Sequence, residues 1–549
     1  MRFPRPSLIV FGVLLLAVVT SAHSHSSQSQ TASTVPGNEA CASCHAGIYN
    51  TYSKTVMARA SGRAGDGLIT GQFLHKPSGV RYRVYTQDGQ VWMSYERQSE
   101  KDFHGQRELL YFIGSGVKGR TYLFSTDGFL FEAPINWYSQ EGKWNMTPAY
   151  TEAQNIPMNL PAYPSCLNCH TSGMQAPEPG TDSKFSGEPF AHSGITCERC
   201  HGAGNGHIEG KGAIVNPAKL TSERRDAICM ECHFEGTAAV EQPGKHLYDF
   251  EPGERLSDYE HYFLLSGNEP RTAQALSQFE ALSLSACKRQ SGDRMWCGSC
   301  HDPHAEPSAS EKAAYYRGKC LKCHGEAFAA RHHADKPDCT SCHMPALPSK
   351  DVAHTEGTDH RILSYPTAQV LPRLKLRGVP LVAFPESDAG LATTRDFALA
   401  WQTLAERGVD GAGQRAAEYL QKAVKERPDD PDVLSALAFV EQENGRQNEA
   451  RELYEQALKA DPLNNEAATN LGLLEARAGN LRRAVELWQR AFARAPHRSA
   501  IGINLAIAFC AAGQRDDARK YVERVLEFNP DYSKAKSLVK KMDAGECRP

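Results

Sequence analysis

The sequence predicts a mainly α protein, in which a first part with few regular elements and a small β-rich insert is followed by an α-solenoid. Three observations carry this prediction. Of 17 cysteines, 14 lie in seven Cys-x-x-Cys pairs between Cys41 and Cys342. A long gap among these pairs holds β-rich runs, and beyond about residue 394 the chain is Ala-rich and repeats with a fixed period. The length of 549 residues allows two or more domains, and a net charge of −3 argues against nucleic acid as a partner.

The first residues predict export. Arg2 and Arg5 precede an apolar run at 8–19, and small residues follow at 20–22. A charged start, a short apolar run and a small-x-small site describe a signal peptide over 1–22, cleaved after Ala22. A retained anchor is the alternative, but spanning a bilayer takes about 20 apolar residues. We expect a periplasmic or otherwise exported mature chain with no membrane span, beginning with a flexible leader at 23–37.

A histidine follows each of the seven cysteine pairs directly. Two thiols at this spacing can each bond one vinyl group of a porphyrin, and the adjacent imidazole then reaches the iron as proximal ligand. Zinc or disulfide bonding is the alternative for any Cys-x-x-Cys. Histidine is only 21 of 549 residues, so it would follow a given pair about 4% of the time by chance.

The sequence therefore predicts seven covalently bound haem c groups in a domain over 38–365. The attachment cysteines are Cys41, Cys44, Cys166, Cys169, Cys197, Cys200, Cys229, Cys232, Cys297, Cys300, Cys320, Cys323, Cys339 and Cys342. The proximal histidines are His45, His170, His201, His233, His301, His324 and His343.

The long gap between the first and second motifs predicts a β-rich insert over about 75–150. An Asp-Gly pair separates β-rich runs at 80–85 and 91–95, and a second Asp-Gly pair interrupts the run at 121–131. Asp-Gly between two such runs is a hairpin signal. The rest of the haem domain is expected to consist of short helices and loops.

The C-terminal part carries a 34-residue repeat. Proline, glycine and alanine recur at this spacing, at Pro428, Pro462, Pro496 and Pro530, at Gly411, Gly445, Gly479 and Gly513, and at Ala416, Ala450, Ala484 and Ala518. This is the period of tetratricopeptide repeats, which are pairs of antiparallel helices. After a linker at 366–393 we expect repeats at 394–427, 428–461, 462–495 and 496–529 and a cap at 530–546. Their concave surface predicts a protein partner, with dimerisation or a solubilising cap as the alternative.

Electron-transfer haems usually have both axial positions of the iron filled, so seven distal ligands are needed. The segment from His192 to His207, around the third motif, resembles a recurrent segment of the multihaem superfamily that includes hydroxylamine oxidoreductase and its tetrahaem electron acceptors. This resemblance covers roughly 38–365 and implies that His192 and His207 are distal ligands. A similar likeness beside the fifth motif implies His304, and the likeness of the domain's last segment implies His354 and His360.

Seven irons need two distal ligands beyond these five, and the remaining candidates are His75 and one of His332 and His333. Relatives often carry a distal histidine shortly after the first proximal one, where this chain has Met57. That side chain is either core packing or a thioether ligand that would raise the haem's potential. The histidines left over are expected to be structural, and they are His104, His246 and His261.

Two functions are compatible with these haem motifs and candidate ligands. In the first, seven six-coordinate haems pass electrons between redox partner proteins. In the second, which the resemblance implies, one open haem acts on a small nitrogen or sulfur compound of the nitrite, hydroxylamine or tetrathionate class. The chain has no Cys-x-x-Cys-Lys motif and as many distal candidates as irons, which favours the carrier. Side chains of the insert wall a substrate pocket or simply pack together, and these are Tyr111, Arg120, Tyr122, Trp137, Tyr138 and Trp144.

Three cysteines lie outside the motifs. Cys287 is either an inert thiol or one placed beside a haem, Cys510 is expected in a helix core, and Cys547 could pair between molecules. If the repeats form a separate arm, deleting residues 394–549 should leave the haem spectrum intact.

Overall fold

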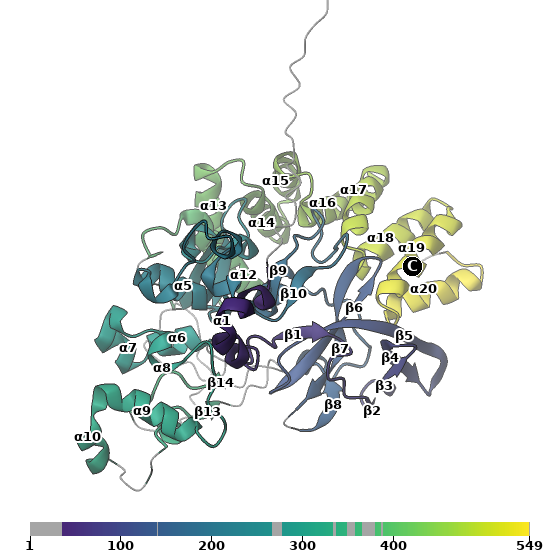
Figure 1. Cartoon of the computed structure of the whole chain (residues 1–549). Coiled ribbons are helices and arrows are strands. Elements are labelled where there is room, and N and C mark those ends of the chain that lie inside the picture. The colour runs from purple at the N-terminus through teal and green to yellow at the C-terminus, as the bar shows by residue number, and fades with distance from the viewer. Residues whose placement is uncertain are drawn as a thin grey trace, which may run out of the picture. The chain divides into compact units, whose positions relative to one another are not determined.

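The computed structural model describes residues 36–139, 141–265, 277–332, 336, 338–347, 357–364, 379–385 and 388–547 (Figure 1). The predicted signal peptide (1–22), the leader up to residue 35, the distal candidates His333 and His354 and much of the predicted linker lie outside the described residues. The described residues belong to one compact unit. In the described part of the chain, no helix is long and apolar enough to cross a membrane.

An eight-stranded antiparallel sheet fills the gap between the first and second motifs. Its strands are β1 (Ser61–Arg63), β2 (Gly71–His75), β3 (Val80–Gln87), β4 (Gln90–Arg97), β5 (Glu100–Ile113), β6 (Gly119–Thr126), β7 (Phe129–Tyr138) and β8 (Lys143–Met146). Strands β2 to β8 lie in chain order across the sheet, and β1 pairs with β5. The prediction of a mainly α protein with only a small β-rich insert is therefore wrong, because this sheet is a major element with its own core.

The residues of the turns and strands explain which parts of the sheet could be predicted from the sequence. The two Asp-Gly hairpins are confirmed: they join β3 to β4 and β6 to β7, with positive φ at both residues of each turn, as type I′ turns require. The longest strand, β5, begins with a largely exposed polar stretch that hides its period-2 pattern. Its pairing is supplied by β4, β6 and β1 instead. The sheet core contains Tyr82, Met93, Phe124, Phe131 and Ile135.

The haem-motif region consists of short helices, small strand pairs and loops. Its helices are α1 (Asn38–Tyr52), α2 (Pro164–His170), α3 (Glu198–His201), α4 (Asn205–Ile208), α5 (Ser222–His233), α6 (Gln278–Ser283), α7 (Ala286–Ser291), α8 (Cys297–Cys300), α9 (Lys312–His324), α10 (Glu326–Arg331) and α11 (Thr340–His343). Five 3-10 turns lie at Pro148–Tyr150, Pro217–Lys219, Leu247–Asp249, Leu256–Asp258 and Gly292–Arg294. Paired strands are β9 (Thr171–Met174) with β10 (Phe190–Ser193), β13 (Ala346–Leu347) with β14 (Gly357–Thr358), and β12 (Glu260–Leu265) between β11 (Ala238–Glu241) and β15 (Leu381–Phe384).

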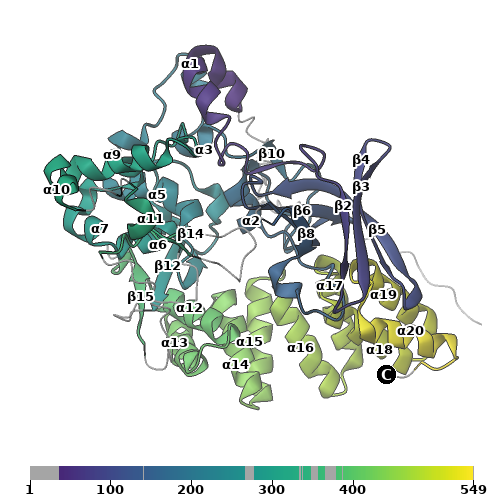
Figure 2. The ribbon, with the colours of Figure 1, turned by 90° about the horizontal axis from the view of Figure 1, so that it is seen from below.

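Four antiparallel helix pairs and a final helix make up the C-terminal part (Figure 2). The pairs are α12 (Thr394–Glu406) with α13 (Ala412–Glu426), α14 (Pro431–Glu443) with α15 (Gln447–Ala460), α16 (Asn465–Arg477) with α17 (Leu481–Arg494), and α18 (Ser499–Ala511) with α19 (Arg515–Phe528), followed by α20 (Ser533–Asp543). The periodic glycines lie in the turns within the pairs with φ between 75° and 87°, a conformation that glycine adopts without strain. The periodic alanines are fully buried, so each pair packs closely.

A disulfide links Cys510 in α18 to Cys547 behind α20, with 2.07 Å between the sulfur atoms. The expectation that Cys547 pairs between molecules is therefore corrected, and Cys510 is both buried and bonded. Residue spacing gives no sign of this pair, because 37 residues separate the two cysteines and the fold of α19 and α20 brings them together.

Replacing Cys510 and Cys547 by alanine is expected to lower the free energy of unfolding of the last repeat by up to about 4 kcal/mol. The reason is that the cross-link closes a 37-residue loop, which restricts the unfolded chain. Denaturant unfolding followed by far-ultraviolet circular dichroism measures the change, with Cys287→Ala as the control. An unchanged midpoint in the double variant would count against a structural role.

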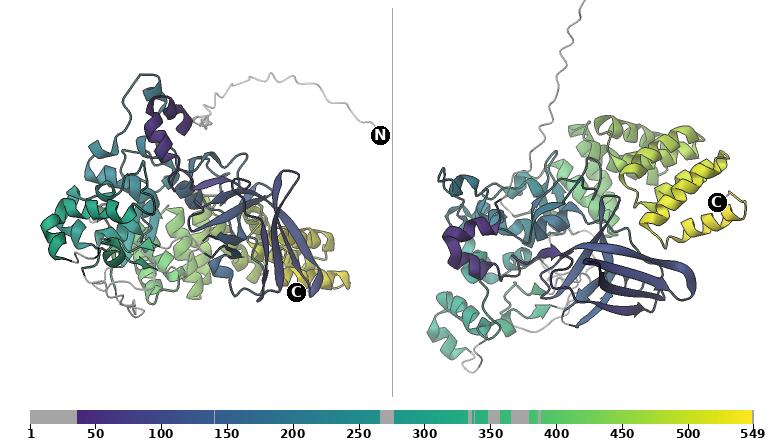
Figure 3. Two further views of the ribbon diagram at one scale, coloured as in Figure 1. Left: turned by 60° about the horizontal axis from the view of Figure 1, so that its bottom comes forward. Right: turned by 45° about the vertical axis from the view of Figure 1, so that its right-hand side comes forward.

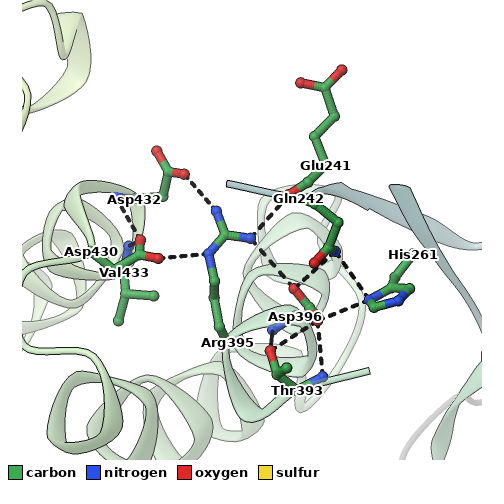
Figure 4. A network of polar contacts seen from close by, with 9 residues as sticks. All are labelled: Glu241, Gln242, His261, Thr393, Arg395, Asp396, Asp430, Asp432 and Val433. Atoms are coloured by element: carbon green, nitrogen blue, oxygen red, sulfur yellow. Dashed lines mark hydrogen bonds and ion pairs between the residues drawn. The ribbon is translucent and has the colours of Figure 1, made fainter. Parts of the chain in front are cut away.

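The first repeat shares a core with the β11–β12–β15 sheet. Phe263 and Leu265 of β12 pack in one cluster with Trp401 and Leu404 of α12. Beside this core, Arg395 donates to Asp430 at 2.7 Å, to Asp432 at 2.8 Å and to the Glu241 carbonyl oxygen at 3.0 Å (Figure 4).

In the same network the buried Asp396 carboxylate lies 2.9 Å from His261 Nδ1 (Figure 4). Burial acts to raise the pKa of Asp396, but hydrogen bonds from His261 and Thr393 outweigh it and leave the pKa below its usual value. The repeats are thus joined to the haem-motif region by both apolar packing and charge.

The fourth repeat lies beside the eight-stranded sheet (Figure 3), and its Phe528 belongs to the core of that sheet. The Phe528 ring meets the Phe129 and Phe131 rings edge to face, with centroids 5.8 and 5.7 Å apart. Next to it, Arg97 of β4 forms a buried ion pair with Asp531 at 2.5 Å. We call the contacts of the repeats and their cap with residues before 394 the seam. Because of the seam, the repeats are not a free arm.

Candidate haem centres

Every motif lies in or directly next to a helix, and in six of the seven this helix ends at or next to the motif's histidine. Helices α2, α3, α5, α9 and α11 end at the proximal histidine, and α8 ends one residue before His301. In α1 the backbone leaves helical geometry at His45 (φ −114°, ψ 38°). Residues i and i+3 lie on one side of a helix, so the two thiols of a motif face the same way. The local fold therefore presents two sulfur atoms and one imidazole together, as haem attachment needs.

Four of the proximal imidazoles face a second imidazole at a nearly constant distance. The ring centroids of His45 and His207 lie 6.4 Å apart at an interplanar angle of 16°, and those of His201 and His304 lie 6.0 Å apart at 16°. His301 faces His360 at 6.2 Å and 28°. His343 faces His332 at 5.8 Å and 31°.

This distance fits one iron between the two rings. An imidazole nitrogen binds a transition metal at about 2 Å, and the ring centre lies about 1 Å farther out. Two imidazoles on opposite sides of one metal are therefore about 6 Å apart, centre to centre. The four pairs span 5.8 to 6.4 Å. The side chains thus fit haem with two histidine ligands.

Hydrogen bonds at Nδ1 orient these rings. His201 Nδ1 lies 2.8 Å from the Val215 carbonyl oxygen, and His343 Nδ1 lies 2.6 Å from that of Leu363. His360 Nδ1 lies 2.7 Å from the Thr358 carbonyl oxygen. A carbonyl accepts, so Nδ1 carries the proton and Nε2 keeps its lone pair for a metal. Sequence reasoning missed these supports because backbone carbonyls leave no residue signature.

The other distal candidates lie in different settings. His75 is buried at the end of β2, with Nδ1 at 2.7 Å from Ser78 Oγ and Nε2 at 2.9 Å from the Thr151 carbonyl oxygen. Both of its nitrogens are thus in hydrogen bonds with the protein. His192 lies on β10, with its ring next to Gly37. Met57 is half-buried between α1 and β1. The distal ligands of His170, His233 and His324 stay predictions.

Cysteines of different motifs are in contact. A hydrogen bond with Cys297 raises the pKa of Cys229 well above its usual value and lowers that of Cys297. A hydrogen bond with Cys169, together with burial, raises the pKa of Cys232. Two further thiol contacts join Cys41 to Cys197 and Cys320 to Cys339. Motifs one and three, two and four, four and five, and six and seven are therefore neighbours.

Of the two alternatives for the polar and aromatic side chains of the insert, the contacts favour packing against one another or against neighbouring loops. The Trp144 ring lies 5.3 Å from Tyr122 and 5.9 Å from Trp137. Arg120 lies 3.9 Å above the Phe112 ring. Tyr111 donates to Glu188 at 2.5 Å. Each of these residues thus has a role in holding the sheet together.

Comparisons with known families agree with a haem-motif region followed by tetratricopeptide repeats. The tetratricopeptide repeat model matches residues 410–473 and 475–542. The model for cytochrome c554 and c-prime matches 138–202, and that for the doubled CXXCH motif matches 290–329. The chain is a multihaem c-type cytochrome fused to tetratricopeptide repeats. These matches do not extend to the hydroxylamine oxidoreductase superfamily, which stays a resemblance.

Among solved structures, MamA is 20% identical and covers 27% of this chain and 84% of its own, with a TM-score of 0.23. A structure from the study of pilF of Pseudomonas aeruginosa is 22% identical, with 28% and 71% covered and a TM-score of 0.25. A tetratricopeptide repeat protein from Parabacteroides merdae is 17% identical, with 28% and 60% covered and a TM-score of 0.24. A search of curated proteins finds no match.

Proposed function

We propose that this protein is an exported electron carrier in which seven haems form a continuous path between redox partners. The four facing imidazole pairs carry the proposal, because an iron with two histidine ligands has no free position for a substrate. Such haems accept and release electrons without chemistry at the iron. The side chains that could have walled a substrate pocket in the insert pack against other side chains, so they lend the oxidoreductase alternative no support, and that alternative rests on the resemblance alone.

A continuous path is supported by the origin of the distal histidines, because a histidine that follows one motif faces the proximal histidine of another. His207, which faces His45 of the first motif, follows His201 of the third motif by six residues. His304 faces His201 and follows His301 of the fifth motif by three residues. His332 faces His343 of the seventh motif and follows His324 of the sixth by eight. In this arrangement the irons of motifs one, three and seven are each bound by a segment that also binds a neighbouring iron, which keeps these haems close.

Export is supported by two independent features. The first is the signal-peptide pattern over 1–22. The second is the Cys510–Cys547 disulfide, since such bonds persist mainly in oxidising compartments. Attachment of haem c belongs to the same compartment. For the repeats we propose docking of a protein partner through the surface that the seam leaves free.

The central measurement is the number and spin state of the haems. Intact mass and a pyridine haemochrome assay should give seven haem c groups per chain, and electron paramagnetic resonance of the oxidised protein should show low-spin iron alone. A stoichiometric high-spin signal that shifts with nitrite, hydroxylamine or a sulfur oxyanion would contradict the carrier and favour the oxidoreductase.

Replacing His207 by leucine is expected to convert one haem per chain to the high-spin state, because the iron of the first motif loses its sixth ligand. His304→Leu should do the same at the third motif. The matched control is His104→Leu, which removes an exposed histidine of the sheet. Low-spin spectra for both ligand variants would refute the assignment of His207 and His304.

A further inference from the structure

Three haem motifs are joined by residues that haem attachment does not use. Asn168, Arg199 and Glu231 each occupy the second variable position of their Cys-x-x-Cys motif, in motifs two, three and four. Arg199 Nη2 donates to the Asn168 carbonyl oxygen at 3.2 Å and to its Oδ1 at 3.0 Å. The same nitrogen lies 2.8 Å from Glu231 Oε2. We call these residues the motif triad.

The motif triad is deeply buried. The side chains of Arg199 and Glu231 are 14% and 3% exposed, and Asn168 is 2% exposed. The free energy needed to remove two charges from water offsets much of their attraction. A buried ion pair is therefore weak evidence for stability and better evidence for a fixed arrangement. Motifs one, five, six and seven have Ser43, Ser299, Lys322 and Ser341 at the same position, so the chemistry of attachment does not require these groups.

Further contacts make the fourth motif a junction. Cys169 Sγ of the second motif lies 3.9 Å from the Glu231 carbonyl oxygen of the fourth, and Cys229 of the fourth motif lies beside Cys297 of the fifth. Through Glu231 it is paired with Arg199 of the third motif. The fourth motif thus touches motifs two, three and five, and the third motif touches motifs one, two, four and five. A linear chain of haems would give each motif at most two neighbours.

We infer that Asn168, Arg199 and Glu231 are positioning residues that hold the haems of motifs two, three and four at fixed mutual distances, so that the electron path branches where these three motifs meet. The inference rests on the proposed carrier function. The rate of electron transfer between haems falls steeply with distance. A planar guanidinium that is hydrogen-bonded to two partners at once restricts the movement of these partners relative to each other. The second haem is then a side branch through which a separate donor or acceptor exchanges electrons with the path.

The test uses the full-length, haem-loaded protein. The double variant Arg199→Met/Glu231→Met removes both charges, so that no unpaired charge remains buried. The control, Lys322→Met, changes the same position in the sixth motif, where the side chain is exposed. Intact mass gives the number of haems, Soret circular dichroism reports the coupling between neighbouring haems, and a spectroelectrochemical titration gives their potentials.

We expect seven haems in all three proteins, with the Soret couplet weakened and two or more potentials shifted in the double variant alone. A double variant with seven haems and the wild-type couplet and potentials would overturn the inference while leaving the carrier function intact. Fewer than seven haems in the unaltered protein would instead contradict the proposed function. If the double variant does not mature, Asn168→Leu decides by the same readouts, because it removes one hydrogen bond of the motif triad without changing the charge.

Discussion

A chain that ends after Thr393 is expected not to yield a stable seven-haem protein. Without the repeats, four core side chains of the β11–β12–β15 sheet lose their cover, and these are Val240, Phe263, Leu265 and Leu381. Each buried side chain of this kind is worth about 1.5–3 kcal/mol, so the loss is roughly 6–12 kcal/mol, as large as the net stability of a typical domain. The sheet also loses Phe528 from its own core.

Expression of this truncated chain measures the effect through its soluble yield, its haem content and its resistance to proteolysis. The matched control is the full-length Cys510→Ala/Cys547→Ala variant, which keeps every seam contact. From the sequence alone, the same deletion was expected to leave the haem spectrum intact. A soluble truncated protein with seven haems and an unchanged Soret spectrum would restore that expectation and show that the seam is dispensable.

The parts of the fold that sequence reasoning identified depend on local chemistry. An Asp-Gly pair can adopt two successive positive φ values, so both hairpins of the sheet were visible. Glycine within each helix pair and proline between pairs recur every 34 residues, which made the repeats visible. Strand β5 was not, because its polar first half resembles a loop until β4 and β6 pair with it. The seam was invisible for the same reason: most of its partners are more than a hundred residues apart.

In the candidate site, too, the residues that are adjacent in the chain could be predicted, whereas the contacts that only the fold creates could not. Attachment cysteines and proximal histidines are adjacent in the chain, so their chemistry could be predicted from spacing alone. Distal histidines come from other motifs. Resemblance pointed to His207, His304 and His360 and counting to His332, but none of this showed which imidazole each one faces. The motif triad gave no signal at all, because one residue in each of three motifs forms no pattern until the helices meet.

Replacing Arg97 by methionine is expected to lower the free energy of unfolding by roughly 3–5 kcal/mol, the usual effect of breaking a buried ion pair. Its partner Asp531 is 1% exposed and remains buried as a carboxylate, held only by Lys536 and the Ile156 N–H group. Arg97 also donates to the Ser78 carbonyl oxygen and lies 4.4 Å above the Phe103 ring, so its loss loosens β4 as well.

Chemical denaturation followed by far-ultraviolet circular dichroism measures this loss. Arg81→Met is the matched control, since Arg81 pairs with Glu96 on the same sheet, where the two side chains are 36% and 60% exposed. Exposed pairs contribute about 0–1 kcal/mol. Equal effects of the two substitutions would mean that the contact of the fourth repeat with the sheet contributes little to stability.

The pH dependence of Asp531→Asn tests the same ion pair in a second way. Burial acts to raise the pKa of Asp531, but hydrogen bonds from Arg97, the Ile156 N–H group and Lys536 outweigh it, and the pKa lies below its usual value. A carboxyl whose pKa is lowered by folding stabilises the protein above its unfolded pKa, about 3.9, and loses this effect as the pH falls through the folded pKa. The unaltered protein should therefore be more stable than Asp531→Asn at neutral pH, and the difference should shrink as the pH falls below about 4. A difference that stays constant down to low pH would mean that the amide disturbs the seam by its shape and that the charge of Asp531 contributes nothing.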